Sequence, residues 1–263
     1  MSTTLTEQSL GFAAQSVAGQ VRAHNEDAVL CCPELGLWAV ADGMGGHQSG
    51  EVASALALQV LREVIGNGGE LVAAAQAANT AIIEAGEAAG GRRMGTTLVA
   101  LHFTGAEFEL AWIGDSRAYR VSAAGIEQLS RDHSWVQLMV DAGEMSEAEA
   151  RQHPRRNIVI QCLGQTEQEL EVGVLRGTLA SGELLLLCSD GLSGELSDEQ
   201  IQQLCAEAET LDELVEQLIG LANQLGGKDN ISCVVLGLNT PESPVIAARP
   251  RNFLSRWLSS RKP

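Results

Sequence analysis

At 263 residues the chain suits one large domain or two small ones, and its 45% hydrophobic content is enough for a sizeable core. The formal net charge of −17 argues against nucleic acid as the main partner and is compatible with bound divalent cations. Six scattered cysteines without Cys-x-x-Cys spacing are interpreted as buried reduced thiols. Reduced thiols predict a cytoplasmic protein, and no stretch is typical of a membrane span or signal peptide.

Apolar periodicity predicts strands alternating with helices. The predicted strands lie at 11–17, 28–32, 37–41, 97–103, 108–113, 118–121, 126–129, 158–163, 172–174, 184–188 and 231–238. Helices are predicted at 49–65, 70–89, 197–207 and 211–225, with a helical segment at 134–152 that Gly143 interrupts. Ser146 and Glu149 in that segment are spaced as a capping box. This order fits an α+β domain of two mainly antiparallel sheets with helices packed outside, and 231–238 is interpreted as an interior strand.

Acidic residues mark the ends of several predicted strands. Apolar runs lead into Asp42, Asp115 and Asp190, and Asp27 and Asp229 directly precede apolar segments. Carboxylates at short range repel one another, so five acid-bearing strand ends suggest convergence on something cationic. For each Asp-Gly pair taken singly, an ordinary turn is the alternative.

Seven short motifs occur in one order along residues 11–238. They are Arg22-x-x-Asn25-Glu26-Asp27, Asp42-Gly43-Met44-Gly45-Gly46, Gly95-Thr96-Thr97, Gly114-Asp115-Ser116-Arg117, Asp132-His133-Ser134, Ser189-Asp190-Gly191 and Asp229-Asn230. In this order they resemble the motifs of the metal-dependent protein phosphatases, the type 2C serine/threonine phosphatase family. The chain is identified as a bacterial member of that family.

The resemblance implies a four-layer α-β-β-α sandwich, in which two mainly antiparallel sheets are flanked by helix pairs. It also implies a centre of two Mn²⁺ or Mg²⁺ ions in a cleft at one end. In the family, the residue matching Asp42 bridges both ions and the carbonyl matching Gly43 binds one of them. The acids matching Asp190 and Asp229 hold the other ion.

The remaining site roles also follow from the resemblance. Glu26 and Asp27 match acids that act mostly through metal-bound water, and Arg22 matches the arginine that binds the substrate phosphate. A guanidinium fits phosphate oxygens better than an ammonium does. The alternative for Arg22 is a structural pair with one of these acids.

Elementary chemistry agrees with this metal assignment. Oxygen-only ligands suit hard cations, and the missing His/Cys spacing disfavours zinc. Two ions about 3.5–4 Å apart can hold a bridging hydroxide and stabilise both ends of an in-line displacement. Direct attack of that hydroxide on phosphorus predicts a mechanism without a phosphoenzyme intermediate.

The chain departs from the family pattern in two places. Animal relatives carry a histidine, often assigned as general acid, directly after the Asp-Gly, where Met44 stands here. His47 is the candidate proton donor, and a surface histidine or donation by metal-bound water are the alternatives. For a third, weaker metal, relatives use acids matching Asp115 and Asp190. Some relatives add another acid at the position of Gly194, and Glu195 stands one residue beyond it.

Other residues of the motifs are interpreted as structural. Arg117 beside Asp115 is expected to form an ion pair, and the Thr96 and Thr97 hydroxyls to bond locally. Asp132 and His133 are expected to position the polar segment 134–156. This segment matches a mobile flap of bacterial relatives, and a solvated helical excursion is the alternative.

The chain is divided into a tail at 1–10, a catalytic domain at 11–239 and a basic amphipathic tail at 240–263. Residues 241–263 carry a net charge of +4. Because the whole chain carries −17, the residues before them carry a net charge of −21. Apolar residues spaced as one helical stripe suggest docking to a membrane surface, to a partner or to the acidic body. Disorder without a role is the alternative.

The expected function is hydrolysis of phosphoserine and phosphothreonine in proteins, opposing a bacterial Ser/Thr kinase. Its expected partners are therefore phosphorylated proteins and the cognate kinase, and the expected state is a monomer. A catalytically weak pseudophosphatase that binds phosphoproteins is the alternative. Another metal-assisted phosphoester hydrolase is a third interpretation.

Overall fold

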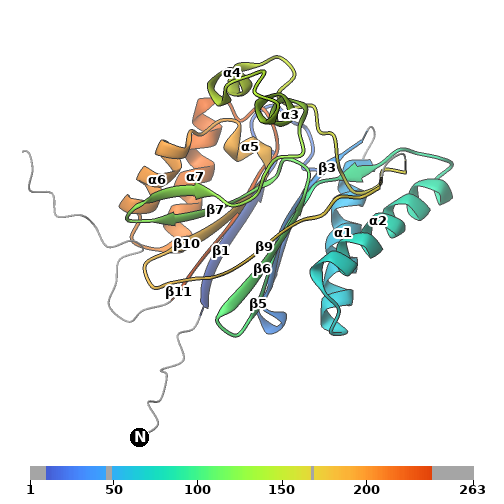
Figure 1. The fold of residues 1–263 in the computed structure, drawn as a ribbon, viewed down its shortest axis with the longest axis horizontal. Helices are drawn as coiled ribbons and strands as arrows, with labels where there is room; N and C mark the ends of the chain where they lie inside the picture. The colour runs from blue at the N-terminus through green and yellow to red at the C-terminus, as the bar shows by residue number, and fades with distance from the viewer. Residues whose placement is uncertain (1–9, 46–48, 167–168, 239–263) are drawn as a thin grey trace, which may run out of the picture.

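The computed structural model describes residues 10–45, 49–166 and 169–238. Two sheets pack face to face, with one pair of helices outside each, so the predicted four-layer sandwich is confirmed (Figure 1). Every strand pairing in the described part of the chain is antiparallel. No helix in these ranges is both long and apolar enough to cross a bilayer.

The first sheet has the order β1-β11-β10-β7-β8. Its strands are β1 (Leu10–Val17), β11 (Ile231–Leu238), β10 (Leu184–Cys188), β7 (Arg117–Ser122) and β8 (Gly125–Gln128). β11 lies between β1 and β10, which confirms the predicted interior position. Helices α6 (Asp198–Glu207) and α7 (Leu211–Leu225) cover its outer face.

The second sheet has the order β2-β3-β5-β6-β9. Its strands are β2 (Asp27–Cys32), β3 (Leu37–Met44), β5 (Leu98–Thr104), β6 (Glu107–Ile113) and β9 (Gly173–Thr178), and β4 (Gly95–Thr96) pairs with the end of β3. The turn η1 (Pro33–Leu35) joins β2 to β3. Helices α1 (Ser49–Gly66) and α2 (Leu71–Ala88) cover the outer face through buried small side chains, including Ala53, Ala57, Ala74 and Ala78.

Strand β3 shows why its sequence is a continuous apolar run. Trp38 and Val40 face the core between the two sheets, whereas Leu37, Ala39 and Ala41 face the core under α1 and α2. A strand buried on both faces has no reason to alternate apolar with polar residues. Its last polar residue, Asp42, therefore stands out as a charge carried to the end of a buried strand.

The structure differs from the prediction at three elements: β9 extends to Thr178, beyond the predicted 172–174, and the other two differences concern 158–163 and β3. The run 158–163 is not a strand, and its described backbone makes only isolated bridges, between Val159 and Ser134 and between Leu163 and Thr96. Leu163 meets β4, but β4 is only two residues long, so the pairing stays a single bridge and does not extend into a ladder. Strand β3 continues beyond Ala41 because Gly43 and Met44 pair with β4, so the predicted bend starts later.

The segment 134–156 lies at one end of the sandwich as two short helices, α3 (Trp135–Asp141) and α4 (Glu147–Gln152) (Figure 1). A turn at Gly143 separates them, as predicted. Ser146 and Glu149 form the predicted capping box at the start of α4. Both predicted tails lie mostly or wholly outside the described residues, so the domain division stays a prediction.

Candidate metal centre

Carboxylates from both sheets gather at one end of the sandwich. Pairing of β2 with β3 places Asp27 directly opposite Asp42. Directly opposed residues have Cβ atoms about 4.5–5.5 Å apart, and like charges in such a pair are destabilising. Asp190 opens the short helix α5 (Asp190–Ser193) after β10, and Asp229 precedes β11. The fold therefore brings these four acids to the same end of the molecule.

Asp27 is held by hydroxyls of the opposite sheet. Ser189 donates to its Oδ2 at 2.8 Å and Ser232 donates to the same oxygen at 2.6 Å. The carboxyl group is buried, and its Oδ1 has no hydrogen-bond partner among the described residues. An unpartnered buried carboxylate oxygen is costly, so this atom calls for a cation or a polar ligand.

Burial and mutual repulsion shift the proton affinity of this cluster. Burial raises the pKa of Asp27 to about 6, and the charges of Asp190 and Asp229 contribute, although the two serine hydroxyls oppose the shift. The pKa of Asp42 is raised well above its ordinary value by burial, then by Asp27 and Asp190. Burial also raises the pKa of Asp190, with Asp229 adding to it. A divalent cation would remove this repulsion.

Backbone packing explains why Gly43 follows Asp42. A Cβ atom at Gly43 would clash with the carbonyl oxygens of Glu26 and Gly50, so no larger residue fits between β2 and the start of α1. Gly43 N–H donates to the Glu26 carbonyl at 3.2 Å, and Ser54 of α1 donates to the same carbonyl at 2.6 Å. The Glu26 side chain in turn lies against Gly50. These contacts fix Glu26 and Gly43 beside Asp42.

The residues present fit hard divalent cations in the chemistry of their donors. The predicted set supplies only carboxylate and carbonyl oxygens, which Mn²⁺ and Mg²⁺ accept. As placed, no group of three His, Cys, Asp or Glu side chains in the described ranges could hold an ion. Asp229 is engaged by Arg22, whose Nη2 lies 2.7 Å from Asp229 Oδ2. Arg22 therefore makes the acid pair that the sequence left as its alternative role.

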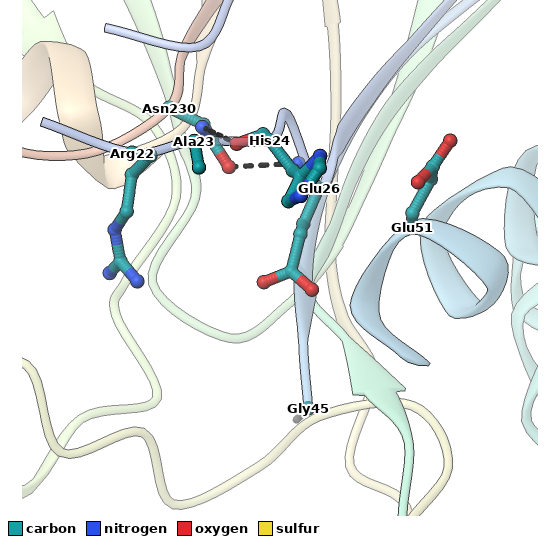
Figure 2. A pocket seen from close by; sticks show the side chains of 7 residues that line it. All are labelled: Arg22, Ala23, His24, Glu26, Gly45, Glu51 and Asn230. Carbon is teal, nitrogen blue, oxygen red and sulfur yellow. Dashed lines mark hydrogen bonds between the residues drawn. The ribbon is translucent and has the colours of Figure 1, made fainter. Parts of the chain in front are cut away.

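A pocket of about 540 Å³ lies beside these acids. Figure 2 shows the Arg22 and Glu26 side chains entering it from the loop between β1 and β2, with Glu51 of α1 on its far side. Asn230 holds this loop: its side chain accepts from Glu26 N–H at 2.8 Å and donates to the His24 carbonyl at 2.8 Å (Figure 2). The Arg22 side chain is 52% exposed, so its other N–H groups can reach a ligand.

Asp115 lies in a second part of the site. It lines a pocket of about 430 Å³ together with Asp190 and Asp229, and residues of α4 line the same pocket. Burial, then the charges of Asp190 and Asp132, raise its pKa well above the ordinary value. Glu195 lines this pocket as well but is paired with Lys228 at 3.5 Å.

Two structural interpretations need correction. Arg117 forms its ion pair with Asp132, at 2.7 Å between Nη2 and Oδ2, rather than with Asp115 beside it. The Thr96 and Thr97 hydroxyls do not bond only locally: Thr96 donates to the Asp42 carbonyl at 2.9 Å and Thr97 accepts from Asp42 N–H at 3.0 Å. The adjacent strand end therefore fixes the backbone of Asp42 on both sides.

His133 connects the start of the segment 134–156 to the turn before Asp115. Its backbone N–H donates to the Gly114 carbonyl at 2.9 Å, and its Nδ1 accepts from Gly114 N–H at 3.3 Å. Burial lowers the pKa of the imidazole, in keeping with a neutral ring that accepts a hydrogen bond. His133 thus anchors this segment, as predicted. The candidate proton donor His47 lies outside the described residues.

The sequence did not indicate that Ser189, Asn230, Thr97 and Ser232 hold the acids in place. Ser189, Asn230 and Thr97 were part of the quoted motifs, whereas Ser232 was not. Ser189 and Asn230 are each next to a motif acid, Ser232 lies in β11, and Thr97 lies between β4 and β5. A hydroxyl or amide in an otherwise apolar strand is the signal that could have pointed to them.

Comparisons with known proteins agree with this geometry. The family model described as "Protein phosphatase 2C" matches residues 19–232. The serine/threonine protein phosphatase PstP of Mycobacterium tuberculosis is 40% identical over 233 residues, which are 86% of this chain and 44% of PstP. The serine/threonine phosphatase stp of Listeria innocua is 34% identical, over 84% of this chain and 93% of its own length.

A solved structure extends the similarity to the fold. The crystal structure of the PstP catalytic domain in complex with two manganese ions is 38% identical, with a TM-score of 0.77, and the match covers 88% of this chain and 99% of that domain. The chain spans less than half the length of full PstP. The family match takes in both helix pairs and every acid of the candidate centre. The chain belongs to the protein phosphatase 2C family.

Proposed function

We propose that this chain is a metal-dependent protein phosphatase that hydrolyses phosphoserine and phosphothreonine and opposes a Ser/Thr kinase. The observation that carries the proposal is the gathering of Asp27, Asp42, Asp190 and Asp229 at one end of the sandwich. The pKa values of the first three are raised, and Oδ1 of Asp27 is buried without a partner among the described residues. Such a cluster is unfavourable without cations. The names of PstP and stp support phosphoproteins as substrates.

The proposed ligand roles are those that the family resemblance implies for these residues. Asp42, near the end of β3, would hold the ions together with the Gly43 carbonyl, Asp190 and Asp229. Glu26 and Asp27 are proposed to act from a second layer, and Asp115 to join Asp190 in a third, weaker site. When bound, the two ions supply an activated water and neutralise charge on the phosphoryl group.

This chain's own side chains bind the substrate phosphate and hold the acids in place. Arg22 stands at the pocket mouth, where its guanidinium can bind phosphate oxygens in a bidentate manner. The Asp229 contact uses Nη2, and an arginine carries five N–H donors. Asn230 and the serines around Asp27 keep the acids in place before substrate binds.

Hydrolysis of p-nitrophenyl phosphate tests the proposal. The protein should turn over this substrate with added Mn²⁺ and lose activity with EDTA. Asp42→Ala and Asp190→Ala should each lose roughly a hundredfold or more in kcat, since bound ions supply several kcal/mol of transition-state stabilisation. When turnover of a ³²P-labelled phosphoprotein is quenched, no label should be bound covalently to the phosphatase. Binding of phosphoproteins without Mn²⁺-dependent turnover would instead identify a pseudophosphatase.

A further inference from the structure

A separate pocket of about 440 Å³ adjoins the candidate centre. Gly45 lines both this pocket and the one beside Arg22, and Figure 2 shows Gly45 at the edge of the latter. The adjoining pocket is lined by residues from the end of α2, the loop before β4 and the run 158–166. Its lining includes Ile82, Arg92, Arg93, Met94, Ile160 and Cys162.

The walls of this pocket are packed against the strand that carries Asp42. Met44 pairs with Gly95, and a Cβ atom at Gly95 would lie 3.2 Å from Cys162 Sγ. A Cβ atom at Gly45 would lie 3.3 Å from the Arg93 carbonyl. Met44 follows Asp42 by two residues, which is about 7 Å along a strand. An extended substrate peptide has the same rise per residue as a strand. A side chain two or three positions from the phosphorylated residue can therefore reach the pocket.

The pocket combines apolar walls with three charged lining residues, of which Arg92 and Arg93 are cationic and Glu87 is anionic. Met94 and Cys162 are buried, and burial raises the pKa of the Cys162 thiol to about 11, so it presents a neutral contact. Arg92 and Arg93 are exposed in a chain whose net charge is −17. The backbone of Arg92 is fixed by its N–H, which donates to the Gly86 carbonyl at 3.1 Å, so its side chain projects from an anchored loop.

We propose that this pocket recognises the sequence of the protein substrate, and that it binds a glutamate side chain two or three positions from the phosphorylated residue. The methylene groups of glutamate suit the apolar interior, and its carboxylate is the complement of the Arg92 guanidinium at the rim. The inference rests on the proposed phosphatase function and names the substrate feature that the same site selects.

Phosphothreonine peptides on a neutral background test this, with Glu, Leu or Lys placed two and three positions from the phosphothreonine on either side. Wild-type kcat/KM should be highest with Glu on one side. An exposed ion pair contributes modestly, so the Glu-to-Lys ratio should be roughly three- to tenfold and should vanish or invert in Arg92→Glu. Arg62→Glu, at the far end of α1 beside Glu34, makes the same charge change and should keep the wild-type ratio.

The outcomes separate this inference from the proposed function. A wild-type protein without a Glu-to-Lys preference, or one that prefers Leu and keeps its ratios in Arg92→Glu, would overturn the pocket assignment. An equal change in Arg62→Glu would attribute the preference to the general field of the protein and also overturn it. Failure of the wild-type protein to hydrolyse p-nitrophenyl phosphate with Mn²⁺ would reject the phosphatase function itself.

Discussion

Replacement of Asp27 by asparagine should change how the stability of the metal-free protein depends on pH. The folded protein raises the pKa of Asp27 from 3.8 to about 6, chiefly through burial. Between these values the folded state holds more protons than the unfolded state, so the wild-type free energy of unfolding falls as pH rises from about 4 to 6. Asparagine has no charge to lose or gain there, so the variant lacks the contribution of Asp27 to this dependence, whereas those of Asp42, Asp115 and Asp190 remain.

The size of the effect follows from the shift. A shift of about two units at 1.36 kcal/mol per unit gives about 3 kcal/mol, most of which develops between pH 4 and pH 7.5. The carbonyl of the introduced asparagine can still accept from Ser189 and Ser232, which both donate to one oxygen of the wild-type carboxyl. Its amide nitrogen takes the place of the unpartnered Oδ1 at a pH-independent cost of about 1–3 kcal/mol. The difference between the two pH values is therefore the quantity to measure.

Urea unfolding followed by tryptophan fluorescence, in EDTA at pH 4 and pH 7.5, gives this difference. Glu127→Gln removes an exposed carboxylate from β8 and should shift stability by less than about 0.5 kcal/mol at either pH. With excess Mn²⁺ at pH 7.5 the wild type should be more stable than Asp27→Asn, the reverse of their order in EDTA at that pH, because the wild type gains more free energy of unfolding from cation binding. A stability difference between wild type and Asp27→Asn that is the same at pH 4 and pH 7.5 would show that burial does not raise the pKa of this carboxyl.

Three other variants test separate parts of the site. Arg22→Ala should lower kcat/KM for phosphopeptides roughly ten- to a hundredfold, because charged hydrogen bonds to the phosphate are lost. Its Mn²⁺ affinity, measured by calorimetry, should rise up to about fivefold because Asp229 loses its partner. Weaker Mn²⁺ binding would contradict this. Gly43→Ala should destabilise the fold by about 1–3 kcal/mol in urea through its clash with two backbone carbonyls, whereas Gly220→Ala in α7, with open space around it, should not. Asp115→Ala should reduce turnover most at limiting Mn²⁺, and full turnover at every Mn²⁺ concentration would exclude a third site.

Much of the fold could be predicted because its cores impose simple patterns. Strands β3 and β11 are apolar on both faces, and Ser146 and Ser197 open helices with complete capping boxes. The run 158–163 misled the prediction because Leu163 is buried in the core like a strand residue, whereas the backbone makes single bridges, one of them to the two-residue strand β4. Periodicity reports burial, and it reports sheet pairing only when a neighbour is present.

The acids of the site could be predicted, but the contacts that hold them could not. Asp42 stood out at the end of a buried strand, and the family resemblance supplied its proposed partners. That Thr97 fixes the Asp42 backbone across 55 residues, or that Ser232 donates to Asp27 across 205, is set by tertiary packing. The same holds for Arg117, whose partner is Asp132 on the far side of the β7–β8 hairpin rather than its neighbour Asp115.

The two-ion centre can be observed directly in a crystal of the full chain grown with Mn²⁺, with anomalous scattering recorded at the manganese absorption edge. We expect two strong peaks that both contact Asp42, one of them also contacting Asp190 and Asp229, with Arg22 moved off Asp229. A map without manganese peaks between these aspartates, in crystals that keep the Arg22–Asp229 pair, would contradict the metal centre.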